Sequence, residues 1–191
     1  MSQERKPLRP ILAPGKDRAG EKDKNDLVQL CGFKVGDEEY ALGIERIKEI
    51  INPLPIRRIP KAPKIVEGVV ELRGQVLPVI DMRKRFEVPP LSQEELADHA
   101  IMRARKYLIV PIDDRNHVGL IVDRVSDVLR VTRDTVGPPP PLTQNEYARF
   151  FAGVCHHRGR ILMVLALDAL LSSTEKSNLA DLNQGAKGAS T

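Results

Sequence analysis

The residues best suited to metal chemistry lie together at Cys155, His156 and His157. The surrounding pattern predicts a strand, in which adjacent side chains point to opposite faces, so only Cys155 and His157 could share an ion. The sequence has no Cys-x-x-Cys pair to complete such a site, and His99 and His117 each stand alone. We therefore predict a solvated histidine pair near a turn, with no metal and no other cofactor.

Motifs of catalysis are absent from the sequence, which has no Gly-x-Gly-x-x-Gly, Gly-x-x-x-x-Gly-Lys-Ser/Thr or Gly-x-Ser-x-Gly run. Cys31 falls in an alternating apolar segment and is expected to be a small core residue. Asp113 and Asp114 fall in a polar turn, where aspartate suits the backbone geometry. Asp81 follows an apolar strand and either caps a short helix or pairs with the basic residues after it. We therefore predict that the protein is not an enzyme.

A basic run, Arg83-Lys84-Arg85, raises the alternative of phosphate contacts. The whole chain has 30 lysines and arginines against 26 acidic residues, a net charge of +4, and its isoelectric point is about 9.1. Phe86 is the one aromatic neighbour of the run, so base stacking is poorly supported. We expect a solvated helix face here, and a basic β-barrel that binds nucleic acid is the alternative function.

Two Arg-Gly pairs, Arg73-Gly74 and Arg158-Gly159, each separate two apolar segments. Glycine allows the positive φ of a tight hairpin, so it needs no functional explanation. Arginine is not required by such a turn. Each guanidinium therefore either braces neighbouring groups of its own chain or meets a carboxylate of a partner, and the sequence leaves both open.

The elements that would position these residues are mostly strands, because alternating apolar segments are separated by short polar turns. The expected hairpins comprise 27–35 with 40–44, 69–72 with 76–80, 107–112 with 118–122, and 152–156 with 161–167. Short helices are expected at 45–51, 92–103 and 168–171. The helix at 92–103 begins with a capping box, Ser92 and Glu95.

The ends of the chain have a different composition. Residues 1–25 mix charged residues with proline and glycine and predict a disordered tail, and 172–191 predict a flexible C-terminal tail. The sequence begins with no apolar signal segment, and its longest apolar run, Ile161–Leu167, is far shorter than the roughly 20 residues that span a bilayer. Two cysteines are too few for a disulfide framework. These features predict a cytoplasmic protein.

An internal repeat organises the segment between the tails. Residues 45–51 match 123–129 at an offset of 78, and the block around Arg73-Gly74 matches that around Arg158-Gly159 at an offset of 85. The repeat predicts two similar β units, about 27–88 and 102–171, with an apolar seam that suits a docking partner. The amphipathic segments 47–51 and 125–129 either line that seam or belong to the core.

Several blocks together resemble the CheW family of bacterial chemotaxis coupling proteins. The blocks that carry the resemblance are Gly36–Tyr40, Ile47–Ile51, Pro60–Pro63, Gly68–Asp81, Gly119–Val128 and Pro138–Pro141. The resemblance covers the whole compact segment, taken as residues 26–171. It implies an all-β fold with short helices, in which two similar five-stranded β-barrel subdomains pack around a shared hydrophobic groove.

The resemblance also implies a function. Members of the family are non-catalytic adaptors that couple chemoreceptors, the methyl-accepting chemotaxis proteins, to a CheA-type histidine kinase. The expected partners are therefore the regulatory domain of that kinase and the cytoplasmic tip of the receptors, with recruitment to membrane-associated arrays. Positions that match the family's partner-binding motifs are Ile47, Glu49, Gly68, Arg73, Gly119, Val122 and Val128. Which of them meets the receptor and which the kinase stays open.

Overall fold

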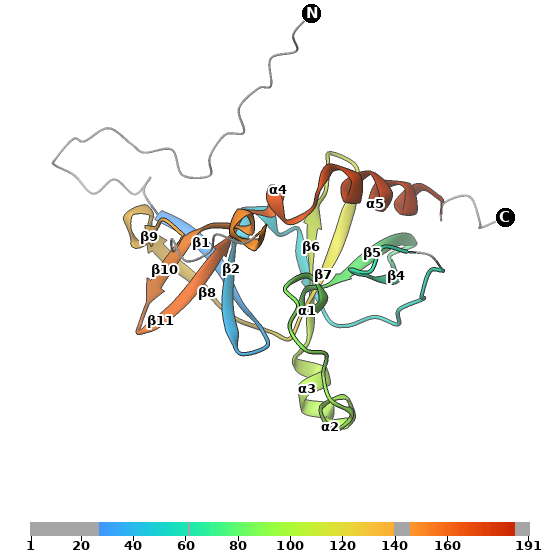
Figure 1. Ribbon diagram of the computed structural model, residues 1–191, viewed down its shortest axis with the longest axis horizontal. Coiled ribbons are helices and arrows are strands. Elements are labelled where there is room, and N and C mark those ends of the chain that lie inside the picture. Colours follow the sequence, from blue (N-terminus) through green and yellow to red (C-terminus); the bar gives the residue numbers. More distant parts are fainter. Residues whose placement is uncertain (1–26, 61, 140–145, 186–191) are drawn as a thin grey trace, which may run out of the picture.

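The structure is a computed structural model that describes residues 27–60, 62–139 and 146–185. The predicted N-terminal tail, the second half of the four-proline run and residues 186–191 lie outside the described residues. Two sheets, A and B, stand side by side (Figure 1). Helix α5 (Ser173–Gly185) lies along one end of sheet B, and helices α2 (Gln93–Ala97) and α3 (His99–Ala104) project from the opposite end.

Sheet A contains six strands in the order β8-β1-β2-β11-β10-β9. Their bounds are β1 Leu27–Val35, β2 Glu38–Gly43, β8 Arg124–Thr132, β9 Val136–Gly137, β10 Phe151–His157 and β11 Arg160–Leu165. Sheet B contains five strands in the order β3-β6-β7-β5-β4. Their bounds are β3 Glu49–Ile51, β4 Val66–Leu72, β5 Gln75–Asp81, β6 Lys106–Pro111 and β7 His117–Val122.

Short helices connect the strands. They are the 3-10 helices η2 Ile44–Arg46, η3 Arg133–Thr135 and η4 Glu146–Phe150, and the α-helices α1 Met82–Arg85, α2 Gln93–Ala97, α3 His99–Ala104, α4 Leu167–Leu170 and α5 Ser173–Gly185. The predicted capping box is confirmed: the Ser92 hydroxyl accepts from Glu95 N, and the Glu95 carboxylate accepts from Ser92 N. The expected single helix over 92–103 breaks at Asp98, which caps α3 through the amides of Ala100 and Ile101.

The mostly β fold with two similar units is confirmed, and all four predicted hairpins form. The units are open sheets rather than closed five-stranded barrels, because each ladder ends at an edge strand and the edge strands β3 and β9 are very short. The helix expected over 45–51 is wrong. After η2 the chain extends into β3, because Glu49, Ile50 and Ile51 pair with β6.

The repeat is present, but the two sheets are not the contiguous ranges 27–88 and 102–171 that we expected. The first hairpin joins the last one, since β2 runs parallel to β11 with Ala41 opposite Val164. In sheet B, β5 runs parallel to β7 with Val79 opposite Gly119. Each sheet therefore takes one hairpin from each half of the repeat.

The two Arg-Gly turns are conformationally alike, as the repeat predicts. Arg73 and Arg158 have φ of 51° and 49°, and the glycine after each has φ of 74°. Two successive positive φ values are those of a type I′ hairpin turn, which suits the twist of the strands. The repeat is thus visible in backbone geometry as well as in sequence.

Apolar side chains form three buried groups. One group fills sheet A and includes Leu129 and Leu162, and another fills sheet B and includes Val79 and Ile109. The largest group lies between the sheets and takes residues from both, together with α4, α5 and η4. We call this group the shared core.

The C-terminal segment is not the flexible tail that we expected, at least as far as residue 185. Helix α5 packs against β5 and β7, and Leu179 is buried in the shared core. The helix begins with a second capping box, in which Ser172 and Glu175 exchange hydrogen bonds. Glu175 also pairs with Arg85 of α1 at 2.9 Å. Burial of Leu179 and these polar contacts stabilise helix α5 against the rest of the protein.

Candidate partner-binding site

An ion pair joins two of the predicted residues. The guanidinium of Arg73 donates to both carboxylate oxygens of Glu49, at 3.2 Å from Nη1 and 2.8 Å from Nη2. Glu49 lies on β3, one edge of sheet B, and Arg73 lies in the turn that follows β4, the other edge. The pair therefore spans the opening between the two edge strands. Arg73 braces a carboxylate of its own chain, and its side chain is still 75% exposed.

One transverse row of sheet B contains three predicted residues. Glu49 lies opposite Ile109, and Ile109 lies opposite Gly119. Gly119 lies opposite Val79, which lies opposite Gly68. Directly paired residues share a face of the sheet, so the row runs from the Glu49 carboxylate across all five strands. Three predicted residues that are far apart in the sequence thus lie in one row across the sheet.

The two glycines of this row are buried and allow close approach. A Cβ added to Gly119 would lie 2.9 Å from Val79 Cγ1. Gly68 has φ of +155°, and a Cβ there would lie 2.4 Å from the carbonyl oxygen of Arg57. Both distances are shorter than an ordinary van der Waals contact. These glycines therefore shape the sheet and do not present a side chain to a partner.

The remaining three predicted residues lie elsewhere. Val122 is 1% exposed in the shared core, and Ile47 is partly buried against the same core. Val128 lies on β8 of sheet A and is 50% exposed. The predicted set is therefore divided between an exposed rim on sheet B, the shared core and the surface of sheet A.

A small pocket of about 240 Å³ adjoins the Glu49–Arg73 pair. Its lining residues are Lys48, Glu49, Leu72, Arg73, Gln75, Leu77, Ile109 and His117. Burial and the charge of Lys48 lower the pKa of His117, with Asp113 opposing them. The pocket is lined by three aliphatic side chains together with charged and polar ones.

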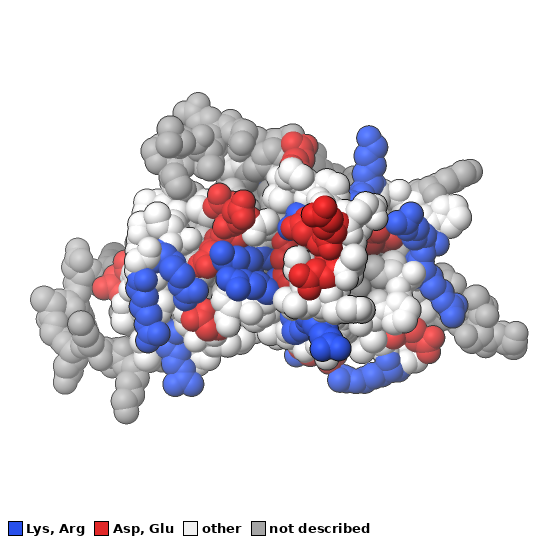
Figure 2. Space-filling view, turned by 90° about the horizontal axis from the view of Figure 1, so that it is seen from below, with Lys and Arg blue, Asp and Glu red and all other residues white. Residues whose placement is uncertain are grey.

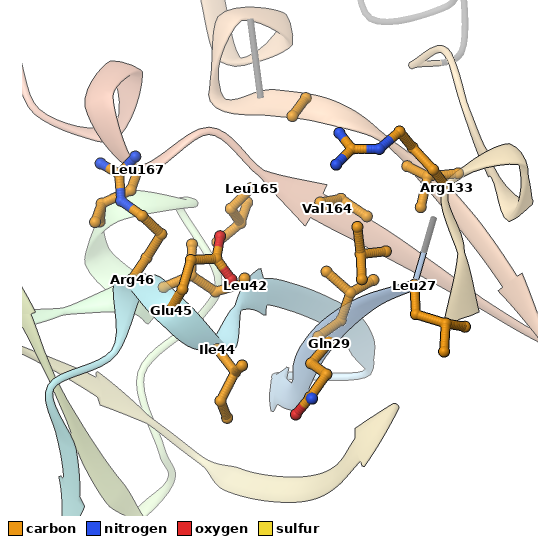
Figure 3. A pocket seen from close by; sticks show the side chains of 15 residues that line it. Leu27, Gln29, Leu42, Ile44, Glu45, Arg46, Arg133, Val164, Leu165 and Leu167 are labelled. Carbon is orange, nitrogen blue, oxygen red and sulfur yellow. The ribbon is translucent and has the colours of Figure 1, made fainter. Parts of the chain in front are cut away.

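A larger cavity of about 450 Å³ opens on sheet A (Figure 3). Its walls are mainly apolar and include Leu30, Leu42 and Val164. Glu45 and Arg46 lie at one end of the view and Arg133 at the other. This cavity could not be predicted from the sequence, because β11 meets the hairpin of β1 and β2 only after folding.

The groups considered for chemistry have structural roles. Asp81 caps α1 by accepting from Arg83 N at 2.8 Å and also pairs with Arg105. Asp113 accepts from the side-chain amide of Asn116 and from the backbone amides of Arg115 and Asn116, and these hydrogen bonds lower its pKa. Cys31 is a core residue as predicted, and burial raises its pKa to about 11. Among the described residues, no three metal-ligating side chains gather.

Comparison with known proteins decides the family. The chain matches the family model described as "CheW-like domain" over residues 29–175, which is most of its length. The chain belongs to this family. It is an adaptor of chemotaxis signalling, as the resemblance predicted.

Curated members of the CheW-like family align along most of the chain. A probable chemotaxis protein CheW from Rhizobium etli is 35% identical over 77% of this chain and 89% of its own length. The chemotaxis protein CheW from Treponema pallidum is 32% identical over 81% and 88%. The solved structure of the scaffolding protein TtCheW from Thermoanaerobacter tengcongensis superposes with a TM-score of 0.67. That structure is 26% identical and is matched over 83% of this chain and 96% of its own.

The comparisons give no support to the alternative of nucleic-acid binding. The basic run that suggested it is not the solvated face we expected, because each residue pairs with a carboxylate. The pairs are Arg83 with Asp123, Lys84 with Glu67, and Arg85 with Glu175. On the face seen in Figure 2, acidic and basic side chains are interspersed. A CheW-like protein with this surface offers no continuous basic stripe there for phosphates.

No helix among the described residues is long and apolar enough to cross a membrane.

Proposed function

We propose that this CheW-like protein joins the cytoplasmic tip of chemoreceptors to the regulatory domain of a CheA-type histidine kinase. The observation that carries the proposal is the match to the CheW-like family along most of the chain. Its relatives are named as chemotaxis and scaffolding proteins. The adaptor acts without catalysis, in the cytoplasm, where it is recruited to receptor arrays.

The geometry supports an adaptor because two chemically different surfaces lie on different sheets. The rim of sheet B presents the Glu49–Arg73 pair beside a small pocket. Sheet A presents the exposed aliphatic side chain of Val128. A protein that must bind two partners at once needs separate surfaces, one for each. Apolar contact would supply most of the affinity, and the charged rim would set specificity and association rate.

The seven predicted residues then divide by role. Glu49, Arg73 and Val128 are exposed enough to touch a partner, and Ile47 reaches the surface at the edge of the shared core. Gly68, Gly119 and Val122 are buried and act by holding the strands beneath the surface. Substitution of the buried residues would change binding by distorting the sheet.

Titration of the purified protein with its two partners tests the proposal. The kinase regulatory domain and a receptor cytoplasmic fragment from the same genome are added separately, and the dissociation constants are measured. Glu49→Lys and Val128→Glu are compared with Glu71→Lys and Ile161→Glu. These controls place the same charges at other exposed positions, on β4 and β11 respectively.

We expect each test variant to weaken one partner about tenfold or more, which corresponds to about 1.4 kcal/mol, while both controls stay near wild type. Circular dichroism checks that all four variants fold. The assignment of these residues is wrong if test and control variants bind equally well. Absence of wild-type binding to both partners would exclude the adaptor role itself.

A further inference from the structure

Asp123 is the single residue that connects sheet B to sheet A between β7 and β8. Strand β7 ends in sheet B at Val122, and β8 begins in sheet A at Arg124, so one residue makes the crossing. The passage from β2 to β3 takes residues 44–48 instead. The backbone conformation at Asp123 therefore has a direct effect on how the sheets are oriented.

Asp123 forms two hydrogen bonds with the backbone of the first hairpin of sheet A. Its carboxylate oxygen Oδ2 accepts a hydrogen bond of 2.7 Å from Gly36 N, in the turn between β1 and β2. Its own backbone N donates to the carbonyl oxygen of Lys34, on β1, at 3.0 Å. These contacts hold the carboxylate in one position relative to sheet A.

The same carboxylate forms an ion pair with an arginine next to sheet B. Arg83 of α1, which follows β5 directly, donates from Nε to Oδ1 at 2.9 Å and to Oδ2 at 3.0 Å. Arg105, just before β6, lies 4.0 Å from Oδ1 and 3.4 Å from Asp81. The two arginines and two aspartates balance in charge, and each side chain is at most 16% exposed.

Arg83 is well suited to this contact. Burial lowers the pKa of its guanidinium, but the hydrogen bond and charge of Asp123 outweigh burial and raise the pKa above its usual value. Removal of either partner would leave a charge inside the junction that is no longer balanced, which proteins tolerate poorly. We therefore expect the ion pair between Arg83 and Asp123 to stay formed in the folded protein.

We propose that Asp123 is a positioning residue that sets the angle between sheets A and B, held by Gly36 on one side and by Arg83 on the other. The shared core and the edge at Ile47 lie between the same sheets. The angle thus determines the shape of the seam and the relative placement of Glu49 and Val128. The consequence for joining receptor to kinase rests on the proposed function. The role of Asp123 in setting the angle between the sheets does not.

Distance measurement between the sheets tests this role on the isolated protein. Spin labels are placed at Arg130 on β8 and Glu71 on β4, both exposed, after replacement of Cys31 and Cys155 by alanine. Asp123→Asn keeps an acceptor for Gly36 N and removes the charge that holds Arg83. Asp123→Glu keeps the charge and lengthens the side chain.

Two controls separate positioning from general destabilisation. Asp127→Asn removes a carboxylate whose partner, Arg160, lies at 3.0 Å within the same sheet. Leu129→Ala weakens the core inside sheet A and leaves the junction intact. Unfolding by denaturant provides the stability of each variant.

We expect Asp123→Glu to shift the mean distance and Asp123→Asn to widen the distance distribution, while both controls keep the wild-type distribution. Equal distributions in all folded variants would overturn the proposal, and so would equal widening in Leu129→Ala. If Asp123→Asn does not fold, the charged Asp123→Glu variant decides. Because no partner is present, a failure of receptor or kinase binding would leave this result unaffected.

Discussion

Ala41 and Val164 lie side by side in a parallel ladder that joins the first hairpin of the described chain to the last. The equivalent ladder in sheet B places Gly119 beside Val79. The two halves of the repeat are therefore intertwined, because neither can complete its own sheet. We therefore expect the two halves to fold together as one cooperative unit.

Separated halves should consequently fail to fold. Fragments 27–101 and 102–185 each lack one hairpin of both sheets, so neither can bury the shared core. We expect each fragment alone to lack the circular dichroism and cooperative unfolding of the intact protein. Mixing or coexpressing them should restore both signals. A fragment that unfolds cooperatively by itself would show that a half is independently stable.

Matched substitutions at the two Arg-Gly turns measure how much the Glu49–Arg73 ion pair contributes to the free energy of unfolding. Among the residues that the structure describes, Arg158 forms no ion pair, so Arg158→Asn changes mainly the residue at a positive φ. Asparagine tolerates this conformation better, and we expect a gain of about 0.5 kcal/mol in unfolding free energy.

Arg73→Asn has the same backbone effect but also loses the contact with Glu49. Since the guanidinium is mostly exposed, the pair is screened by solvent and should be worth about 0.2–1 kcal/mol. Denaturant unfolding measures the difference between the two variants. A difference above about 2 kcal/mol would contradict the view of a screened surface pair.

Alanine at the buried glycines of sheet B should destabilise in a defined order. Gly68→Ala combines a positive φ with a Cβ against the Arg57 backbone, and we expect a loss of about 3 kcal/mol or more. Gly119→Ala meets a side-chain methyl of Val79, which can shift, and should cost about 1–3 kcal/mol. Thermal and denaturant unfolding check the order. Gly119→Ala proving the more harmful would contradict it.

The C-terminal helix should lose stability in acid through Glu175. Burial raises the pKa of this carboxyl, but hydrogen bonds from Ser172 and the charge of Arg85 outweigh it and lower the pKa below the ordinary 4.5. The contribution is therefore complete above about pH 4.5 and is lost as the pH falls through the lower folded-state value.

Glu175→Gln should accordingly destabilise by about 1–2 kcal/mol at pH 7 and by less near pH 3. Glu71→Gln, at an exposed position, serves as the control. Unfolding free energies at several pH values measure both. A loss for Glu175→Gln that does not depend on pH would show that the carboxylate charge is not involved.

Much of the local structure could be predicted from the sequence. The four hairpins follow from alternation and turn residues, and the Arg-Gly turns follow from glycine at positive φ. The predicted capping box of Ser92 and Glu95 is confirmed, and the same Ser-x-x-Glu pattern recurs at Ser172 and Glu175 in a polar segment. That pattern, followed one turn later by the apolar Leu179, indicates helix α5.

The role of the basic run could not be predicted in the same way. Arg83 and Arg85 belong to a run of three basic residues, and the carboxylates that pair with them come from Asp123 and Glu175, far along the chain. Only folding brings these charges together. The same holds for the cavity of sheet A and for the row from Glu49 to Gly68.

The sequence by itself determined the hairpins, the repeat and the family, because each depends on residues close together or on an ordered set of short motifs. Tertiary structure alone decided which hairpins share a sheet. A hairpin's edge can pair with any strand of suitable pattern, so local propensity does not choose the partner. The choice depends on burying the shared core and on the passage at Asp123, and it places Ala41 beside Val164.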